Sequence, residues 1–109
     1  MDDETKIRVG GNEATFRNLN EMLRAGTTAA DADRLFPFRC ECGVLGCNQL
    51  LELTVPEYEA IRASPVRFFL IDGHEIPEAE RVIERRPRYT IVEKQDLSGQ
   101  VARDTDPRG

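Results

Sequence analysis

This sequence lacks several features that mark common functional classes. No run of apolar residues is long enough to cross a bilayer, so we expect no membrane partner. The formal net charge is −5, and without an excess of positive charge the binding of nucleic acid is disfavoured. Neither a glycine-rich phosphate loop nor an internal repeat occurs. The first residues are acidic, unlike the basic start of a signal peptide, and we therefore expect a cytoplasmic protein.

Histidine occurs only once, as His74, and this scarcity excludes several kinds of active site. A serine hydrolase needs a histidine and an acid beside its serine, and the sequence offers no such set. The zinc-protease pattern His-Glu-x-x-His fails because Glu78 stands where the second histidine belongs. The deaminase pattern His-x-Glu fails because Ile76 replaces the glutamate. The sequence therefore predicts no catalytic residues.

Cysteine, in contrast, is concentrated in one short segment. Cys40, Cys42 and Cys47 form a C-x-C-x4-C pattern, with Gly43 and Gly46 between them. Thiolates that share a zinc ion converge on it, with Zn–S bonds of roughly 2.3 Å. The chain must curl tightly to bring them together, and glycines with positive φ allow such a curl. The odd number of cysteines and the strained ring of a C-x-C pairing argue against disulfides, and the usual spacings of iron–sulfur clusters are missing. The segment predicts a zinc site.

Tetrahedral zinc needs a fourth ligand, and His74 is our prediction for it. This histidine follows an apolar run, in the sequence Asp72-Gly73-His74, where a turn is expected. The prediction is one structural zinc ion in a Cys3His site made of Cys40, Cys42, Cys47 and His74. Other groups could take the fourth position instead, namely Glu41, Asp72, Glu75, a water molecule or a ligand from a second molecule.

Four protein ligands would leave no open coordination position, so such an ion cannot activate water. We therefore expect a non-enzymatic zinc-binding module, a protein-interaction or regulatory protein with an unidentified protein partner. A first alternative is a thiol-based redox or zinc sensor, in which oxidation of the thiolates ejects the ion. A second alternative is a zinc enzyme, which requires that His74 does not bind and that water takes its place.

Hydrophobic periodicity predicts a first helix that begins at Asn12 and stops near Gly26. An apolar stripe runs along one side of it, made of Phe16, Leu19, Met22 and Leu23. Residues 1–11 are polar, contain two adjacent glycines and are expected to form a flexible arm. Because residues 26–34 have the composition of a linker, this helix either folds back onto the sheet or offers its stripe to another chain.

The remaining elements are predicted from alternation, capping and turn residues. Strands are expected at residues 35–38, 51–55, 66–71 and 88–94. The apolar strand 66–71 should be central and covered on both faces. Helices are expected at 56–63 and 77–85, and a turn with a short hairpin at 96–102. These elements predict an α+β fold, a small three- to four-stranded sheet with about three helices, stapled by one structural zinc site.

At 109 residues the chain is long enough for one modest core and too short for two. We therefore expect a single zinc-binding α+β domain at residues 12–102. The flexible arm at residues 1–11 would precede it, and the charged residues 103–109 would follow it as a disordered tail.

The cysteine segment resembles a known zinc-binding loop. Phe38-Arg39-Cys40-Glu41-Cys42-Gly43, continued to Cys47, has the C-x-C-x4-C spacing of the post-SET zinc loop of lysine methyltransferases. In that family a distant cysteine is the fourth ligand, a role that would fall to His74 here. The cofactor motifs of a SET domain are missing, so the resemblance implies the metal geometry and not the methyltransferase activity.

From Asn12 to Gly109 the chain resembles a family of small, uncharacterised actinobacterial proteins. The shared pattern begins with the Asn-Glu-x-x-Phe-Arg-x-x-Asn-Glu helix at residues 12–21 and continues with the Cys-x-Cys loop. Its later parts are Leu53-Thr54, Glu57-Tyr58-Glu59 with Arg62, Gly73-His74-Glu75, Val92-Glu93-Lys94 and Asp106-Pro107-Arg108. The resemblance implies a bacterial, cytosolic protein that binds zinc.

Overall fold

The computed structural model describes residues 2–44 and 46–109. In this part of the chain there are three α-helices, one 3₁₀ turn and five strands arranged in two antiparallel sheets, which confirms the α+β class. The elements are α1 (Asp3–Ala25), η1 (Ala29–Asp31), β1 (Leu35–Arg39), β2 (Leu50–Thr54), α2 (Val55–Arg62), β3 (Arg67–Leu70), β4 (Glu80–Arg85), β5 (Thr90–Lys94) and α3 (Asp96–Asp104). None of the described helices is long and apolar enough to cross a membrane.

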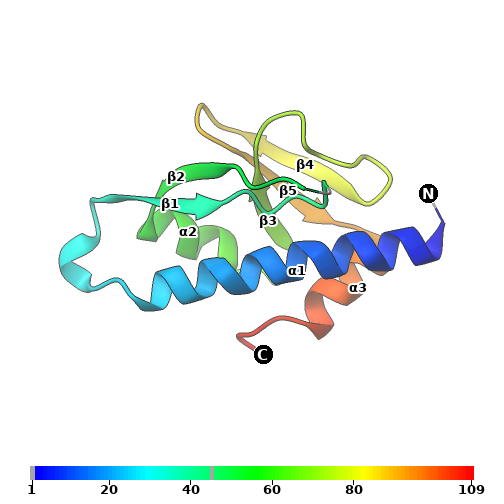
Figure 1. The fold of residues 1–109 in the computed structure, drawn as a ribbon, viewed down its shortest axis with the longest axis horizontal. Helices are drawn as coiled ribbons and strands as arrows, with labels where there is room; N and C mark the ends of the chain where they lie inside the picture. The colour runs from blue at the N-terminus through cyan, green and yellow to red at the C-terminus, as the bar shows by residue number, and fades with distance from the viewer. Residues whose placement is uncertain (1, 45) are drawn as a thin grey trace.

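The strands are divided between two small sheets rather than joined in one. Strands β1 and β2 form a two-stranded hairpin, and the second sheet has the order β3-β5-β4. The apolar segment expected at 66–71 is indeed a strand buried on both faces, but it lies at an edge of its sheet, and β5 is central. Helix α1 runs along the long axis of the molecule beneath both sheets (Figure 1). It therefore spans the junction between them.

Aromatic side chains fill the core between the hairpin, α2 and the three-stranded sheet. Phe38 of β1 stacks on Tyr58 of α2 with ring centroids 4.6 Å apart. Phe69 of β3 meets both rings edge-on, at centroid distances of 6.2 and 6.0 Å. Helix α2 is held in place by the predicted capping box, in which Thr54 Oγ1 and the Glu57 carboxylate each accept a hydrogen bond from the other residue's backbone N–H. The prediction for this helix is confirmed.

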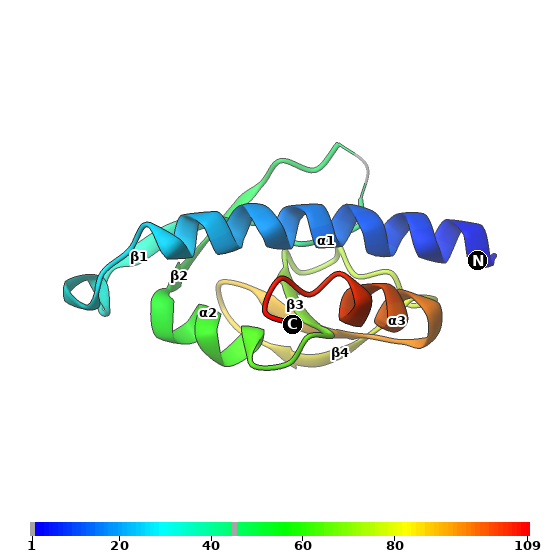
Figure 2. The same ribbon diagram turned by 90° about the horizontal axis from the view of Figure 1, so that it is seen from below.

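Helix α1 extends through the segment that was expected to be a flexible arm. Asp2 caps its first turn, because its carboxylate accepts a hydrogen bond from the backbone N–H of Thr5 at 2.7 Å. Gly10 lies where α1 and α3 meet, and a Cβ on it would come within 3.2 Å of Val101 Cβ. Of the glycine pair that indicated a loose arm, Gly10 therefore permits close contact between α1 and α3. The two helices lie side by side (Figure 2).

The face that α1 buries combines small apolar residues with three polar side chains, and this differs from the predicted apolar stripe. The buried residues of α1 are Val9, Gly10, Glu13, Ala14, Arg17 and Asn20. Of the predicted stripe, Leu19 is 41% and Met22 is 71% exposed. The helix thus folds back onto the core, which was one of the two predicted alternatives. Leu23 of the predicted stripe packs against the aromatic core, but the fully buried side chains lie on a different face.

Each buried charge on α1 meets partners from distant parts of the chain. Glu13 contacts Lys94 at the end of β5, and Lys94 also contacts the carboxylate of Glu80 in β4. Burial lowers the pKa of Lys94 and raises the pKa of Glu80 to about 7, because a low-dielectric interior disfavours either charge. Arg17 donates to the carbonyl oxygens of Pro65 and Ala102 at 2.9 and 3.1 Å. These contacts satisfy charges that would otherwise prevent α1 from docking.

The helix expected at 77–85 is absent: residues 77–79 form a turn and residues 80–85 form strand β4. The spacing of Ala79, Val82 and Ile83 fits one side of a helix, which is why the sequence favoured that structure. In the fold Val82 instead lies opposite Val92 of β5, and the register shifts between Val82 and Glu84. The strand is stabilised by this pairing and by the contact between Glu80 and Lys94, and neither can be read from local sequence.

The end of the chain also differs from its prediction. The expected turn and hairpin at 96–102 form helix α3, and Arg103 belongs to the same helix. Gly99 allows α3 to start tightly against β5, because a Cβ there would lie 3.1 Å from the carbonyl oxygen of Lys94. The expected disordered tail, 103–109, returns to α1, where Arg108 pairs with Glu21 at 2.5 Å. Ion pairs hold this segment in place. Such pairs produce no periodic pattern in the sequence, so the sequence did not predict them.

The two lysines of the chain offer a matched test of how α1 is held. Lys94→Met leaves Glu13 and Glu80 buried without a cation, and we expect the free energy of unfolding to fall by about 3–5 kcal/mol. Lys6→Met removes only a 3.8 Å contact to the exposed Asp96, and we expect a loss of about 0–1 kcal/mol. Urea unfolding at neutral pH measures both values, and equal losses in the two variants would contradict a docking role for Lys94.

Candidate metal centre

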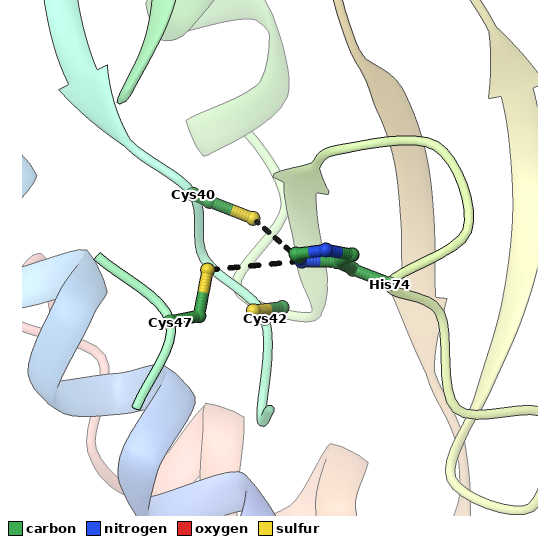
Figure 3. A group of neighbouring side chains, drawn as sticks. All are labelled: Cys40, Cys42, Cys47 and His74. Atoms are coloured by element: carbon green, nitrogen blue, oxygen red, sulfur yellow. Dashed lines mark hydrogen bonds between the residues drawn. The ribbon is translucent and has the colours of Figure 1, made fainter. Parts of the chain in front are cut away.

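The structure brings the four predicted ligand residues together. Cys40 directly follows β1, Cys42 and Cys47 lie in the loop between β1 and β2, and His74 lies in the turn after β3. Their ligand atoms all lie within 4.8 Å of one another. Figure 3 shows the three cysteine side chains and the imidazole pointing toward a common centre. We call residues 40–47 the metal loop, of which Leu45 lies outside the described residues.

The spacing of these atoms fits a tetrahedral ion. Nδ1 of His74 lies 3.8 Å from Cys40 Sγ and 3.7 Å from Cys47 Sγ. With metal–sulfur bonds of roughly 2.3 Å and metal–nitrogen bonds of roughly 2.0–2.1 Å, tetrahedral geometry places sulfur and nitrogen about 3.6 Å apart. Only small movements would bring all four atoms to bonding distance. The group could therefore hold a metal ion, with His74 binding through Nδ1.

Backbone hydrogen bonds within the chain help to close the metal loop. Cys40 N–H donates to the carbonyl of Gln49 at 2.9 Å, which extends the hairpin by one step. Cys47 N–H donates to the carbonyl of Val44 at 3.1 Å and forms the turn that carries the third thiol. Gly46 has φ +80°, the positive value that the sequence predicted for this curl.

Gly43 is needed for another reason than the one predicted. It is not among the described glycines with positive φ. Instead, a Cβ at this position would lie 2.4 Å from Cγ1 of Val9 in α1 and 3.3 Å from Cδ1 of Ile76. The metal loop thus lies in close contact with both α1 and the segment that leads into β4. A side chain at position 43 would overlap Val9, so glycine fits this position best.

Hydrogen bonds to the sulfur atoms favour thiolate formation at one position. The backbone N–H of Ile71 donates to Cys40 Sγ over 3.3 Å. Hydrogen bonding between Cys40 and Cys42 separates their pKa values: it raises the pKa of Cys40, to which burial adds, and lowers the pKa of Cys42 to about 5. The Val44 N–H and His74 also favour the thiolate of Cys42. The thiolate is the form that binds metals, and these contacts favour it at Cys42, whereas they disfavour it at Cys40.

The four candidate ligand residues differ in their exposure to solvent. Cys40 is 2% and Cys42 is 0% exposed, whereas Cys47 and His74 are partly exposed. An ion held here would be covered by the core on the side of Cys40 and Cys42. An ion would exchange, and an oxidant would reach the thiol of Cys47, from the side where Cys47 and His74 are exposed.

The acidic side chains that competed for the fourth position are engaged elsewhere. Asp72 pairs with Arg85 and accepts a hydrogen bond from Thr90 Oγ1 at 3.3 Å. Glu75 accepts hydrogen bonds from the Gly73 N–H at 2.8 Å and from Arg85 at 3.1 Å. These bonds fix both carboxylates outside the group of ligand atoms.

Glu41, the third acidic competitor, is buried and turned away from the thiols. Arg62 of α2 donates to its carboxylate at 3.0 and 3.3 Å, and Asn20 of α1 donates to it at 2.9 Å. Burial raises the pKa of Glu41, and these donors oppose that shift by favouring the carboxylate. The sequence interpretation missed this network. One signal was available, because alternate residues of an extended C-x-C segment point to opposite sides.

The tight fit of Gly43 leads to a prediction. Gly43→Ala should destabilise the protein by about 1–3 kcal/mol, because its methyl group overlaps Val9. In a Val9→Ala background the same change should cost clearly less, since the closer of the two contacts is then removed. Gly11→Ala is the control: nothing lies within 4 Å of its Cβ position, and alanine in place of a helical glycine should stabilise by roughly 0.5–1 kcal/mol. Thermal and urea unfolding of the variants measure this, and an undiminished cost in the Val9→Ala background would show that the contact is unimportant.

Comparison of the chain with models of known protein families, with curated proteins and with solved structures returns no significant match. The resemblances to the post-SET zinc loop and to the small actinobacterial proteins therefore stay predictions.

Proposed function

We propose that this protein binds one zinc ion through Cys40, Cys42, Cys47 and His74. The observation that carries the proposal is the convergence of these four side chains, whose ligand atoms lie within 4.8 Å of one another. Three thiolates and one imidazole suit zinc, which favours sulfur and nitrogen donors in tetrahedral sites. Calcium and magnesium favour oxygen ligands and fit this set poorly.

The ion would serve a structural purpose. The metal loop belongs to the β1–β2 hairpin, whereas His74 follows β3 of the other sheet. Cys47 and His74 are 27 positions apart, so an ion that joins them closes a long loop. Because the unfolded chain has no such site, the free energy of metal binding adds to the stability of the folded state.

A site with four protein ligands has no free position for water or substrate. We therefore propose a non-enzymatic module that acts by binding another protein, in an interaction or regulatory role. The exposed apolar residues of α1 are Ile7, Leu19 and Met22. These side chains stay available while the polar face of the helix is docked, which is consistent with such a role.

A thiol-based sensor is the second candidate, and one observation favours it. Cys47 is the most accessible of the three thiols, since Cys40 and Cys42 are almost fully buried. An oxidant could therefore reach the site at Cys47 without unfolding the core. The enclosed positions of the other two thiols favour the structural role, which we rank first.

Metal analysis and one pair of variants test the zinc site. The purified protein should contain about one zinc ion per chain, and a strong chelator should remove it with a loss of folded structure. His74→Ala should release zinc more readily and melt at a lower temperature than the parent. Glu75→Ala is the control, because this neighbour pairs with Arg85 and should keep its zinc. If the two variants retain zinc equally well, His74 is not a ligand.

The structural role can be separated from an enzymatic one by replacing zinc with cobalt. Four protein ligands should give the absorption spectrum of a tetrahedral thiolate complex, and added azide should leave it unchanged because no position is open. A spectrum that shifts with azide in a saturable manner would instead reveal an exchangeable ligand. Such a result would support the zinc-enzyme alternative.

A further inference from the structure

Glu41 occupies an unusual place for a carboxylate. It lies between Cys40 and Cys42 in sequence, and its side chain is 0% exposed. Both of its oxygens are surrounded by donors: Oε2 accepts from Arg62 at 3.0 Å and from Asn20 at 2.9 Å, and Oε1 accepts from Arg62 at 3.3 Å. A buried charge is costly unless it is paired in this manner, so a hydrophobic residue would be the simpler choice for a purely structural position.

Glu41 also joins the metal loop to the edge of β3 that does not pair with β5. The backbone N–H of Glu41 donates to the carbonyl of Phe69 at 2.9 Å, and the Phe69 N–H donates back to Glu41 Oε1 at 3.3 Å. Two residues further along, the Ile71 N–H donates to Cys40 Sγ. The loop therefore follows the edge of β3 as a neighbouring strand would, with a carboxylate and a thiol in place of two backbone carbonyls.

The groups that hold Glu41 are themselves immobilised. The guanidinium of Arg62 lies 4.9 Å from the ring of Phe68 and also donates to the carbonyl of Arg67. Asn20 forms two further hydrogen bonds to the backbone of Arg39, accepting from its N–H at 2.7 Å and donating to its carbonyl at 2.9 Å. Glu41 is thus fixed from α1, α2 and β3 at once.

Fixing Glu41 also orients the two buried thiols. In an extended chain the residues on either side of Glu41 point to the face opposite its own side chain. Holding the carboxylate on one face therefore presents Cys40 and Cys42 together on the other, where His74 lies (Figure 3). Groups behind metal ligands commonly act in this way, and their loss weakens metal binding by about 10–100-fold.

We propose that Glu41 is the positioning residue of the metal site, and that its ion pair with Arg62 presets Cys40 and Cys42 for a tetrahedral ion. The inference rests on the proposed metal-binding function. It assigns to Glu41 an effect on the affinity and geometry of the site, beyond a contribution to folding.

Glu41→Gln is the direct test. Every partner of the carboxylate is a donor, so whichever oxygen is replaced by the amide NH2 faces another donor. We expect cobalt binding, followed by competition with a chelator, to weaken by about 10–100-fold, with altered thiolate-to-cobalt charge-transfer bands. Glu41→Asp keeps the charge but is too short to reach Arg62 and Phe69 together, and it should not restore the parent affinity or spectrum.

Glu13→Gln is the matched control, because Glu13 is an equally buried glutamate on α1 whose partner is Lys94 and not the metal loop. It should lower stability while leaving cobalt affinity and spectrum as in the parent. If Glu41→Gln does not fold without metal, Asn20→Ala provides the test, since it removes one donor to Glu41 and should change affinity in the same direction. Circular dichroism at the temperature of the titration shows which variants are folded.

The outcomes separate the two proposals. A parent protein that binds neither zinc nor cobalt would overturn the proposed function and this inference with it. A parent that binds the metal, with Glu41→Gln matching Glu13→Gln in affinity and spectrum, would leave the metal site standing and overturn the positioning role. Full recovery by Glu41→Asp would also overturn it, because charge alone would then suffice.

Discussion

The carboxylate of Glu41 lies in the interior of a small protein, where it has to be surrounded by donors to keep its charge. Those donors come from Asn20 in α1, Arg62 in α2 and the backbone of Phe69 in β3. Because each donor has a fixed direction, satisfying one carboxylate sets the relative positions of two helices, one strand edge and the metal loop. The loop that carries the three candidate cysteine ligands is therefore held by polar contacts in the core.

The same requirement explains how α1 docks. Its buried face carries Glu13, Arg17 and Asn20, and each finds partners that lie far away in the sequence. The helix gains its position from directional contacts more than from apolar area, and its more apolar side stays partly exposed. Asn20 donates to Glu41 and Val9 lies against Gly43, so α1 also contacts the metal loop at these two positions.

The candidate metal site brings together segments that belong to the two different sheets. Its cysteines extend from the β1–β2 hairpin, and His74 follows β3 of the three-stranded sheet. An ion bound here would add metal–ligand bonds to the contacts that Glu41 and Cys40 already make with β3. The partial exposure of Cys47 and His74 leaves a route by which the ion could enter after folding.

Several features were predictable from sequence because their causes are local. The spacing of Cys40, Cys42 and Cys47, together with a single histidine in the chain, left few ways to complete a tetrahedral set. The capping box of Thr54 and Glu57 acts within one helical turn, so it located α2 correctly. The alternation along β1 and β2 likewise depends only on neighbouring residues. The capping box and the strand alternation join positions close in the chain. His74 lies 27 positions from Cys47 and was predictable only because the chain has a single histidine.

By itself, then, the sequence determined the α+β class, most of the strands and the set of candidate metal ligands. Only the tertiary structure decided that 80–85 is a strand, that 96–104 is a helix, and which face of α1 is buried. The physical reason is common to all three. Glu80 and Lys94, Ser98 and the carbonyl of Ala79, and Arg17 and the carbonyl of Ala102 meet only when the chain has folded, and their pairing outweighs the local preference of each segment.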